Sequence, residues 1–163
     1  MAALSAPRAI YQYGPDVLPP TRAAGVSGDA IIYHGAMVGP ASDGYMAPAS
    51  TTIRPTGVAD LEAWDDVQST GQAASAHTNA GRVIDATGVA DNVRKLVVRH
   101  GVFKMKNKAG DLVTAALINA SVYVEDDQTV RATSTNSVIA GKLMGFADDG
   151  LPLVLIIPDL DLA

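Results

Sequence analysis

Three histidines are the first residues of this chain to consider for chemistry. His34, His77 and His100 lie far apart, and none has another His or a carboxylate at the spacing of a metal site. We predict that His100 is a hydrogen-bonded structural histidine. A hydrolase would need a pocket in which Glu125 or Asp148 converges on His100, and that weaker alternative stays open.

Three acidic clusters are the second candidate, at Asp65–Asp66, Glu125–Asp127 and Asp148–Asp149. Paired carboxylates can bind Ca²⁺ or transfer protons, but adjacent residues of a strand point to opposite faces. The last two clusters fall at predicted hairpin turns, where Asp is favoured because it tolerates left-handed backbone. We therefore predict turns there, and no catalytic residue, metal ligand or cofactor. The absence of cysteine excludes disulfides and thiolate chemistry.

Short alternating segments separated by turn residues predict the elements that hold these side chains. They favour a mainly β fold, a small antiparallel barrel or sandwich with little helix. Residues 68–82 are small and polar without periodicity, which predicts a long loop. We expect strands at 29–38, bent or bulged at Gly35, at 45–47, at 51–58, interrupted by Pro55, and at 93–106. We also expect single helical turns at 60–64 and 113–119 and hairpins at 121–132 and 138–157.

The fourth of these strands carries the clearest alternation. Leu96 and Val98 mark its apolar face, but further along the apolar positions have the other parity, at Phe103 and Met105. One extra residue turns the faces of a strand over. We therefore predict a β-bulge at His100–Gly101.

The pentapeptide TGVAD occurs twice, at residues 56–60 and 87–91. A fixed period is the signature of repeat architectures. The flanking residues differ, LEAWDD after the first copy and NVRKLV after the second. We interpret the two copies as coincidence.

An extended N-terminal arm is predicted over residues 1–27, before a β-rich domain over residues 28–163. Four prolines in the arm oppose helix and central-strand pairing, because each lacks an N–H group. A solvated tail is the alternative, but the arm carries many apolar groups for a tail. Its candidate contacts with a shell or a neighbouring subunit are Ile10, Tyr11, Tyr13 and Val17.

Charge limits the partners. The formal net charge is −5, which argues against nucleic-acid binding, and the longest apolar run, 151–157, is too short to span a membrane. We expect neither partner. Basic residues nevertheless gather on the fourth strand, and they form either a solvated face or a stripe that meets an acidic patch on a partner. The residues of this stripe proposed as contacts are Arg99, Lys104 and Lys106.

Three segments, by their order and spacing, resemble the capsid decoration (cement) proteins of tailed bacteriophages. They are HGAMVGPASDGYMAPASTTIRPTGVA at 34–59, VVRHGVFKMKNKAGD at 97–111 and SVYVEDDQTVRATSTNSVIAGKLMGFADDGLPLVLII at 121–157. The resemblance spans about residues 29–157. Members of that family often carry an Ala-Asp-Val-Gly-Lys element, where this chain has AALIN at 115–119.

The resemblance implies a structural protein of the virion and not an enzyme. It implies binding to the major capsid protein on the outer surface of the head, which stabilises the shell against internal DNA pressure. It also implies a homo-oligomer, a trimer being favoured over a dimer, with no cofactor. The alternative is a virion-associated β-domain that binds a carbohydrate or host-surface ligand. Such a site needs aromatic platforms, and the chain has two Phe, one Trp and five Tyr.

Overall fold

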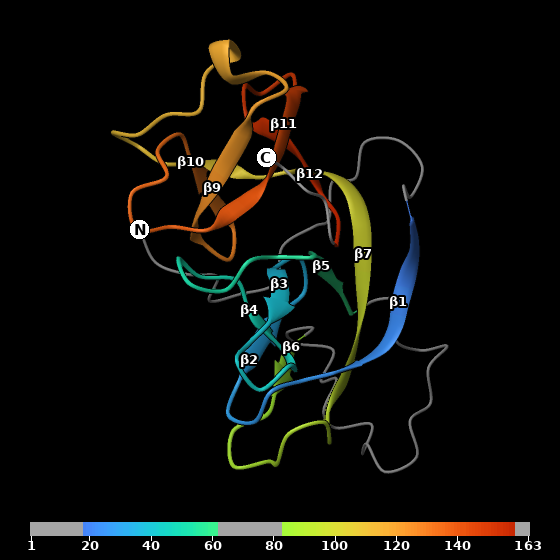
Figure 1. The fold of residues 1–163 in the computed structure, drawn as a ribbon. Coiled ribbons are helices and arrows are strands. Elements are labelled where there is room, and N and C mark those ends of the chain that lie inside the picture. The colour runs from blue at the N-terminus through green and yellow to red at the C-terminus, as the bar shows by residue number, and fades with distance from the viewer. Residues whose placement is uncertain (1–17, 62–82, 159–163) are drawn as a thin grey trace.

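A computed structural model describes residues 18–61 and 83–158 of the chain, and these residues are mainly β, as predicted (Figure 1). Ten strands form one curled sheet, in the order β4-β3-β5-β7-β12-β11-β9-β10-β8 with β1 paired to β7. Their bounds are β1 Leu18–Gly25, β3 Met37–Pro40, β4 Met46–Pro48, β5 Gly57–Asp60, β7 Lys95–Lys104, β8 Lys106–Asn107, β9 Ser121–Asp126, β10 Thr129–Arg131, β11 Ile139–Phe146 and β12 Pro152–Ile156.

A second, two-stranded sheet pairs β2, Ile31–Tyr33, with β6, Val83–Asp85. Figure 1 shows β1 to β6 in one part of the molecule and β8 to β12 in another, with β7 running through both. We call these parts the N-terminal lobe and the C-terminal lobe. The predicted helical turn at 113–119 is a 3₁₀ turn, η3, at Ala115–Leu117.

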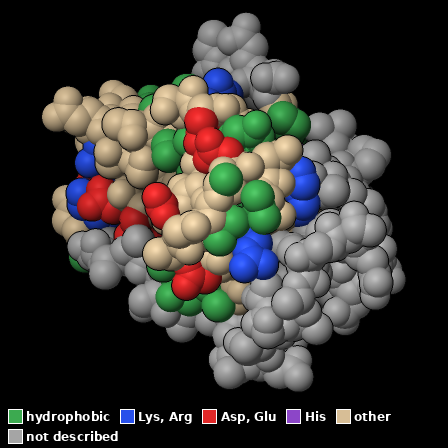
Figure 2. Space-filling view, turned by 90° about the horizontal axis from the view of Figure 1, so that it is seen from below, with side chains coloured by type: hydrophobic (Ala, Val, Ile, Leu, Met, Phe, Trp, Pro, Cys, Tyr) green, Lys and Arg blue, Asp and Glu red, His purple; other side chains and the backbone are tan. Residues whose placement is uncertain are grey.

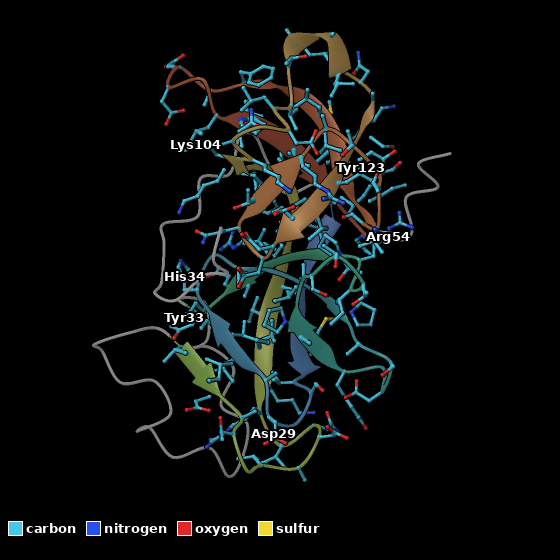
Figure 3. All side chains as sticks on the ribbon, turned by 90° about the vertical axis from the view of Figure 1, so that its left-hand side faces the viewer. Asp29, Tyr33, His34, Arg54, Lys104 and Tyr123 are labelled. Atoms are coloured by element: carbon cyan, nitrogen blue, oxygen red, sulfur yellow. The ribbon has the colours of Figure 1, made fainter. Side chains whose placement is uncertain are left out.

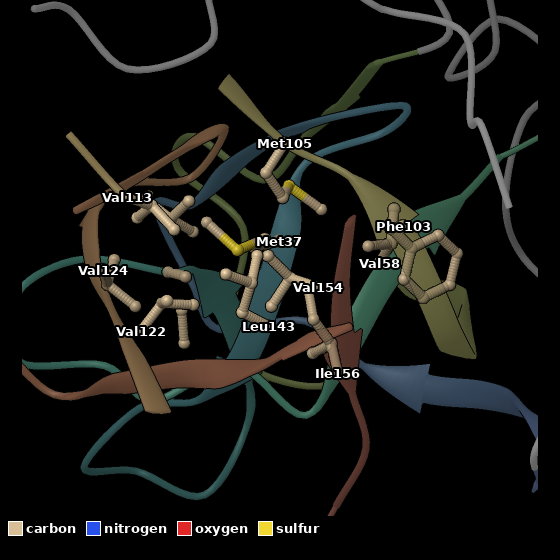
Figure 4. Close-up of a cluster of buried hydrophobic side chains, with 13 residues drawn as sticks. Met37, Val58, Phe103, Met105, Val113, Val122, Val124, Leu143, Val154 and Ile156 are labelled. Atoms are coloured by element: carbon tan, nitrogen blue, oxygen red, sulfur yellow. The ribbon is translucent and has the colours of Figure 1, made fainter. Parts of the chain in front are cut away.

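Each lobe has its own hydrophobic core. The core of the C-terminal lobe is shown in Figure 4, and it includes Phe103, Met105, Val113, Val122, Val124, Leu143, Val154 and Ile156. The core of the N-terminal lobe includes Val26, Ile32, Ala36, Leu61, Ile84, Ala86, Leu96 and Val98. Valine, isoleucine, leucine and alanine supply most of both cores.

Strands β3 and β5 lie between the two cores as a middle layer. Met37 and Val58 belong to the core of the C-terminal lobe, whereas their chain neighbours Val38 and Ala59 belong to the core of the N-terminal lobe. Successive side chains of a strand point to opposite faces. Both faces of this layer are therefore covered, and all four residues of β5 are buried.

The single strand predicted at 29–38 is instead two strands of different sheets, β2 and β3. Gly35 separates them with φ 86°, a conformation that glycine adopts without strain. The return strand predicted at 45–47 is confirmed as β4, after a turn in which Gly44 has φ 83°. The strand predicted at 51–58 begins only at Gly57.

The parity change along β7 is confirmed, but the bulge predicted to cause it is wrong. Residues 97–99 pair with β5 and residues 101–104 pair with β12, each ladder in continuous register. β7 therefore changes its neighbour, and its core, at His100–Gly101. The irregular pairing lies in β1. Leu18 pairs with His100 and Thr21 pairs with Val98, so β1 has one more residue than β7 between these two pairs.

The predicted arm contains a strand from Leu18 onward. Among the described residues β1 pairs with β7 alone, and it includes Pro19 and Pro20. A strand with one paired edge tolerates residues that cannot donate a ladder hydrogen bond, and the skipped register accommodates them. Residues 1–17 lie outside the described residues, as do the loop predicted at 68–82 and most of the helical turn predicted at 60–64.

Candidate functional site

The basic residues expected to face a partner are mostly paired within the chain. The Arg99 Nε donates to Asp60 Oδ2, and the Lys104 Nζ lies 2.8 Å from Asp149 Oδ2. Lys106 is exposed. β7 thus uses its cations to hold β5 and the β11–β12 turn. The four apolar arm residues proposed as contacts, Ile10, Tyr11, Tyr13 and Val17, lie outside the described residues.

Glu125, from the central acidic cluster, joins two cations. The Lys108 Nζ lies 2.7 Å from Glu125 Oε2, and the Arg131 Nη1 lies 3.4 Å from the same oxygen. This carboxylate is only 17% exposed. Its position between two cations suits a structural brace of β9 and β10 and provides no free base.

The rest of that cluster forms the turn predicted between β9 and β10. Asp126 Oδ1 accepts the Gln128 N–H at 3.0 Å, the local capping expected of Asp in a turn. The turn is buried and holds two other strands. The Asp127 carbonyl accepts the Met37 N–H at 2.7 Å, and the Gln128 carbonyl accepts the Lys106 N–H at 2.9 Å.

The turn predicted at Asp148–Gly150 is also confirmed, and it is exposed. Gly150 has φ 78°, and Asp149 Oδ1 accepts the Leu151 N–H at 3.3 Å. The hydrogen bond from Lys104 holds the pKa of Asp149 below its ordinary value of 3.8. Asp65–Asp66 lie outside the described residues.

Two histidines are buried, each with a backbone partner. The His100 Nδ1 lies 2.8 Å from the Thr56 carbonyl oxygen, as expected of a structural histidine. The His34 Nδ1 accepts the Leu61 N–H at 3.1 Å and lies 3.7 Å from Asp60 Oδ1. Within residues 18–61 and 83–158, no group of three or more His, Cys, Asp or Glu could hold a metal ion. His77 lies outside these ranges.

Among the described residues, Tyr33 and Tyr123 lie too far apart in the fold to form a common aromatic platform. Tyr33 on β2 and Tyr123 on β9 are half-buried, belong to different sheets and lie in different lobes (Figure 3). A carbohydrate site needs aromatic faces that converge on one ligand. These two tyrosines do not converge.

The C-terminal lobe exposes three large apolar side chains, two in the segment that holds η3 and one on β11, which we call the apolar tip. Leu112 is 55% exposed, and Ile118 and Met144 are each 44% exposed. The Asn119 N–H donates to the Leu143 carbonyl at 2.8 Å. Asn119 follows Ile118 and Leu143 precedes Met144, so this hydrogen bond holds the two backbone segments side by side. A sequence signal for this surface is that residues 112–120, which include Leu112 and Ile118, carry no charged side chain.

No family model, curated protein or solved structure matches this chain. What the chain does must therefore be argued from its own residues.

The face seen in Figure 2 mixes charges of both signs with hydrophobic side chains. A nucleic-acid site gathers Lys and Arg on one face, and the visible face differs from that arrangement. No helix of the described residues is long and apolar enough to cross a membrane.

Proposed function

We propose that this chain is a decoration protein that binds the outer surface of a tailed-bacteriophage head. The observation that carries the proposal is that the three segments resembling such proteins build one structure. Residues 34–59 contain β3, β4 and most of β5, residues 97–111 contain most of β7 with β8, and residues 121–157 contain β9 to β12. Together they supply all nine strands of the main path through the large sheet.

The physical basis of the activity is repetition. A copy that contacts two or more shell subunits stabilises the bound, intact arrangement by mass action. Contacts worth a few kcal/mol each, repeated over a lattice, raise the barrier to rupture without any catalysis. A module braced by ion pairs between its strands suits this use, because a rigid partner loses little entropy on binding.

We further propose that the apolar tip faces the major capsid protein. Its three side chains leave apolar area in water that docking would remove. They belong to the lobe that includes the longest resembling segment. The residue Val93 provides a matched control, since it is 52% exposed but lies in the turn just before β7, in the other lobe.

Binding of the purified protein to expanded heads that lack their decoration protein tests the proposal. We expect saturable co-sedimentation, ordered density on the shell in electron micrographs and a higher rupture temperature of the heads. A folded protein that leaves the heads bare at micromolar concentration would contradict the function.

Two further comparisons separate the surfaces. Ile118→Asp should weaken head binding while Val93→Asp leaves it unchanged, with both variants folded. Equal binding by the two variants would reject the apolar tip but leave the function intact. Deleting residues 2–17, which spares β1, should preserve the fold and weaken head binding or self-association; unchanged occupancy would reject the arm as a contact.

A further inference from the structure

The two buried histidines use the same ring atom in opposite ways. The His100 Nδ1 faces the Thr56 carbonyl oxygen, so it must carry a proton and donate. The His34 Nδ1 faces the Leu61 N–H, so it must accept and carry no proton. A neutral imidazole has one ring proton, which in His34 is therefore on Nε2.

Protonation has different consequences at the two sites. An imidazolium donates from both ring nitrogens, so His100 keeps its bond to Thr56 in either charge state. His34 does not keep its bond, because a proton on Nδ1 confronts the Leu61 N–H with a second donor.

The new proton on His34 has an acceptor nearby. The Asp60 Oδ1 lies 3.7 Å from the His34 Nδ1, on a side chain only 5% exposed. The other oxygen of Asp60 accepts the Arg99 Nε, so the carboxylate is already fixed by β7. Among the described residues, the charged groups near the ring include the Asp60 carboxylate of β5, which is itself bound to Arg99 of β7.

We propose that His34 is a pH-sensitive latch on the end of β5. Neutral His34 holds the Leu61 amide, and protonated His34 releases it and turns toward Asp60. The rest of β5 stays in place, because the Ala59 N–H donates to the Ala36 carbonyl at 2.8 Å and involves no histidine. The device is therefore local to Leu61, the first residue after β5.

Amide hydrogen exchange measured by NMR between pH 7.5 and 5.5 tests this latch. We expect the protection factor of the Leu61 amide to fall by about fivefold or more as the ring resonances of His34 titrate, the factor that one hydrogen bond represents. The protection factor of the Ala59 amide should stay constant over the same range.

His34→Asn gives the matched variant. The Asn Oδ1 takes the place of Nδ1 as an acceptor but does not titrate, so Leu61 should remain protected at both pH values. Three results would overturn the proposal: His34 titrates while Leu61 protection is unchanged, His34 fails to titrate before the protein unfolds in acid, or the variant keeps the pH dependence. The first two are read on the wild-type protein, so they stand even if the variant fails to fold.

Discussion

At the scale of single residues, close approach of strands decides where glycine is needed. Gly141 on β11 lies against β12 so tightly that a Cβ atom there would be 2.2 Å from the Leu155 carbonyl oxygen. Real Cβ atoms do not come so close to backbone, so one of the two strands must shift.

Gly141→Ala should therefore lower the free energy of unfolding by about 2–3 kcal/mol, the upper part of the range for overpacked cores. Gly110→Ala is the control, since its Cβ would meet open space but its φ of +85° costs about 1 kcal/mol. Urea unfolding of both variants measures the difference. A smaller loss for Gly141→Ala than for Gly110→Ala would show that β11 and β12 separate easily.

The pH dependence of Asp111 can also be predicted. The Thr133 Oγ1 donates to Asp111 Oδ2 at 2.6 Å, and this hydrogen bond is the main reason that the pKa of Asp111 lies below 3.8. A depressed folded pKa gives stability that is present above pH 3.8 and is lost as the pH falls through the folded pKa. Thr133→Val should bring the pKa of Asp111 back toward 3.8, whereas Thr133→Ser should keep it low. Carboxyl ¹³C titration by NMR checks both; an unchanged pKa in the valine variant would reject this cause.

The sequence predicted the turn role of the acidic residues but not their ion pairs. Turn chemistry is local, so Asp148–Gly150 could be placed from its own composition. Lys104 and Asp149 are 45 residues apart, and Arg99 and Asp60 are 39 apart. Only the folded sheet brings such partners together, and this is why the sequence left the basic stripe as either a solvated face or a contact surface.

At the scale of elements, β7 is the strand on which the two lobes depend. Gly101 is buried, has φ 155° and stands where the ladder passes from β5 to β12. Gly145 on β11 has φ 156° but is half-buried with open space around it. The two glycines share a backbone conformation and differ in burial.

Gly101→Val should therefore destabilise the protein by more than about 1 kcal/mol, and by more than Gly145→Val, because it adds a buried side chain to the same backbone strain. Thermal unfolding of both variants is the measurement. Equal melting temperatures would mean that burial at the crossing point has no cost.

The two TGVAD copies show the limit of local sequence at this scale. The first copy enters β5, buried on both faces between the cores. The second copy forms a turn between β6 and β7 in which Gly88 has φ +68°. The two identical pentapeptides adopt different structures because their surroundings in the fold differ. This agrees with the interpretation that the repeated sequence is a coincidence. The same effect displaced the strand predicted at 51–58.

At the scale of the whole molecule, the two cores should unfold together. β3 and β5 contribute side chains to both, and β7 runs from one to the other. Neither core is complete without these shared strands. The sequence predicted the mainly β class from local patterns, but not this sharing, since the strands that meet are distant along the chain.

Val38→Ala in the core of the N-terminal lobe and Val122→Ala in that of the C-terminal lobe should each cost about 2 kcal/mol and shift one common transition. Methyl resonances of Ile84 and Leu143, one from each core, would follow denaturant unfolding separately. Their midpoints should coincide in the wild type and in both variants. Two midpoints, each moved only by the variant of its own lobe, would show that the lobes are independent.

The middle layer also constrains when the chain can fold. Met37 and Val58 complete a core whose other members include residues as late as Val154 and Ile156. During synthesis β3 and β5 emerge from the ribosome before β12 has been made. The apolar face of these strands that carries Met37 and Val58 is therefore exposed to solvent until β12 is available. The core of the C-terminal lobe therefore cannot be completed before β12 is made, and we expect chaperones to bind the uncovered face of the layer during translation.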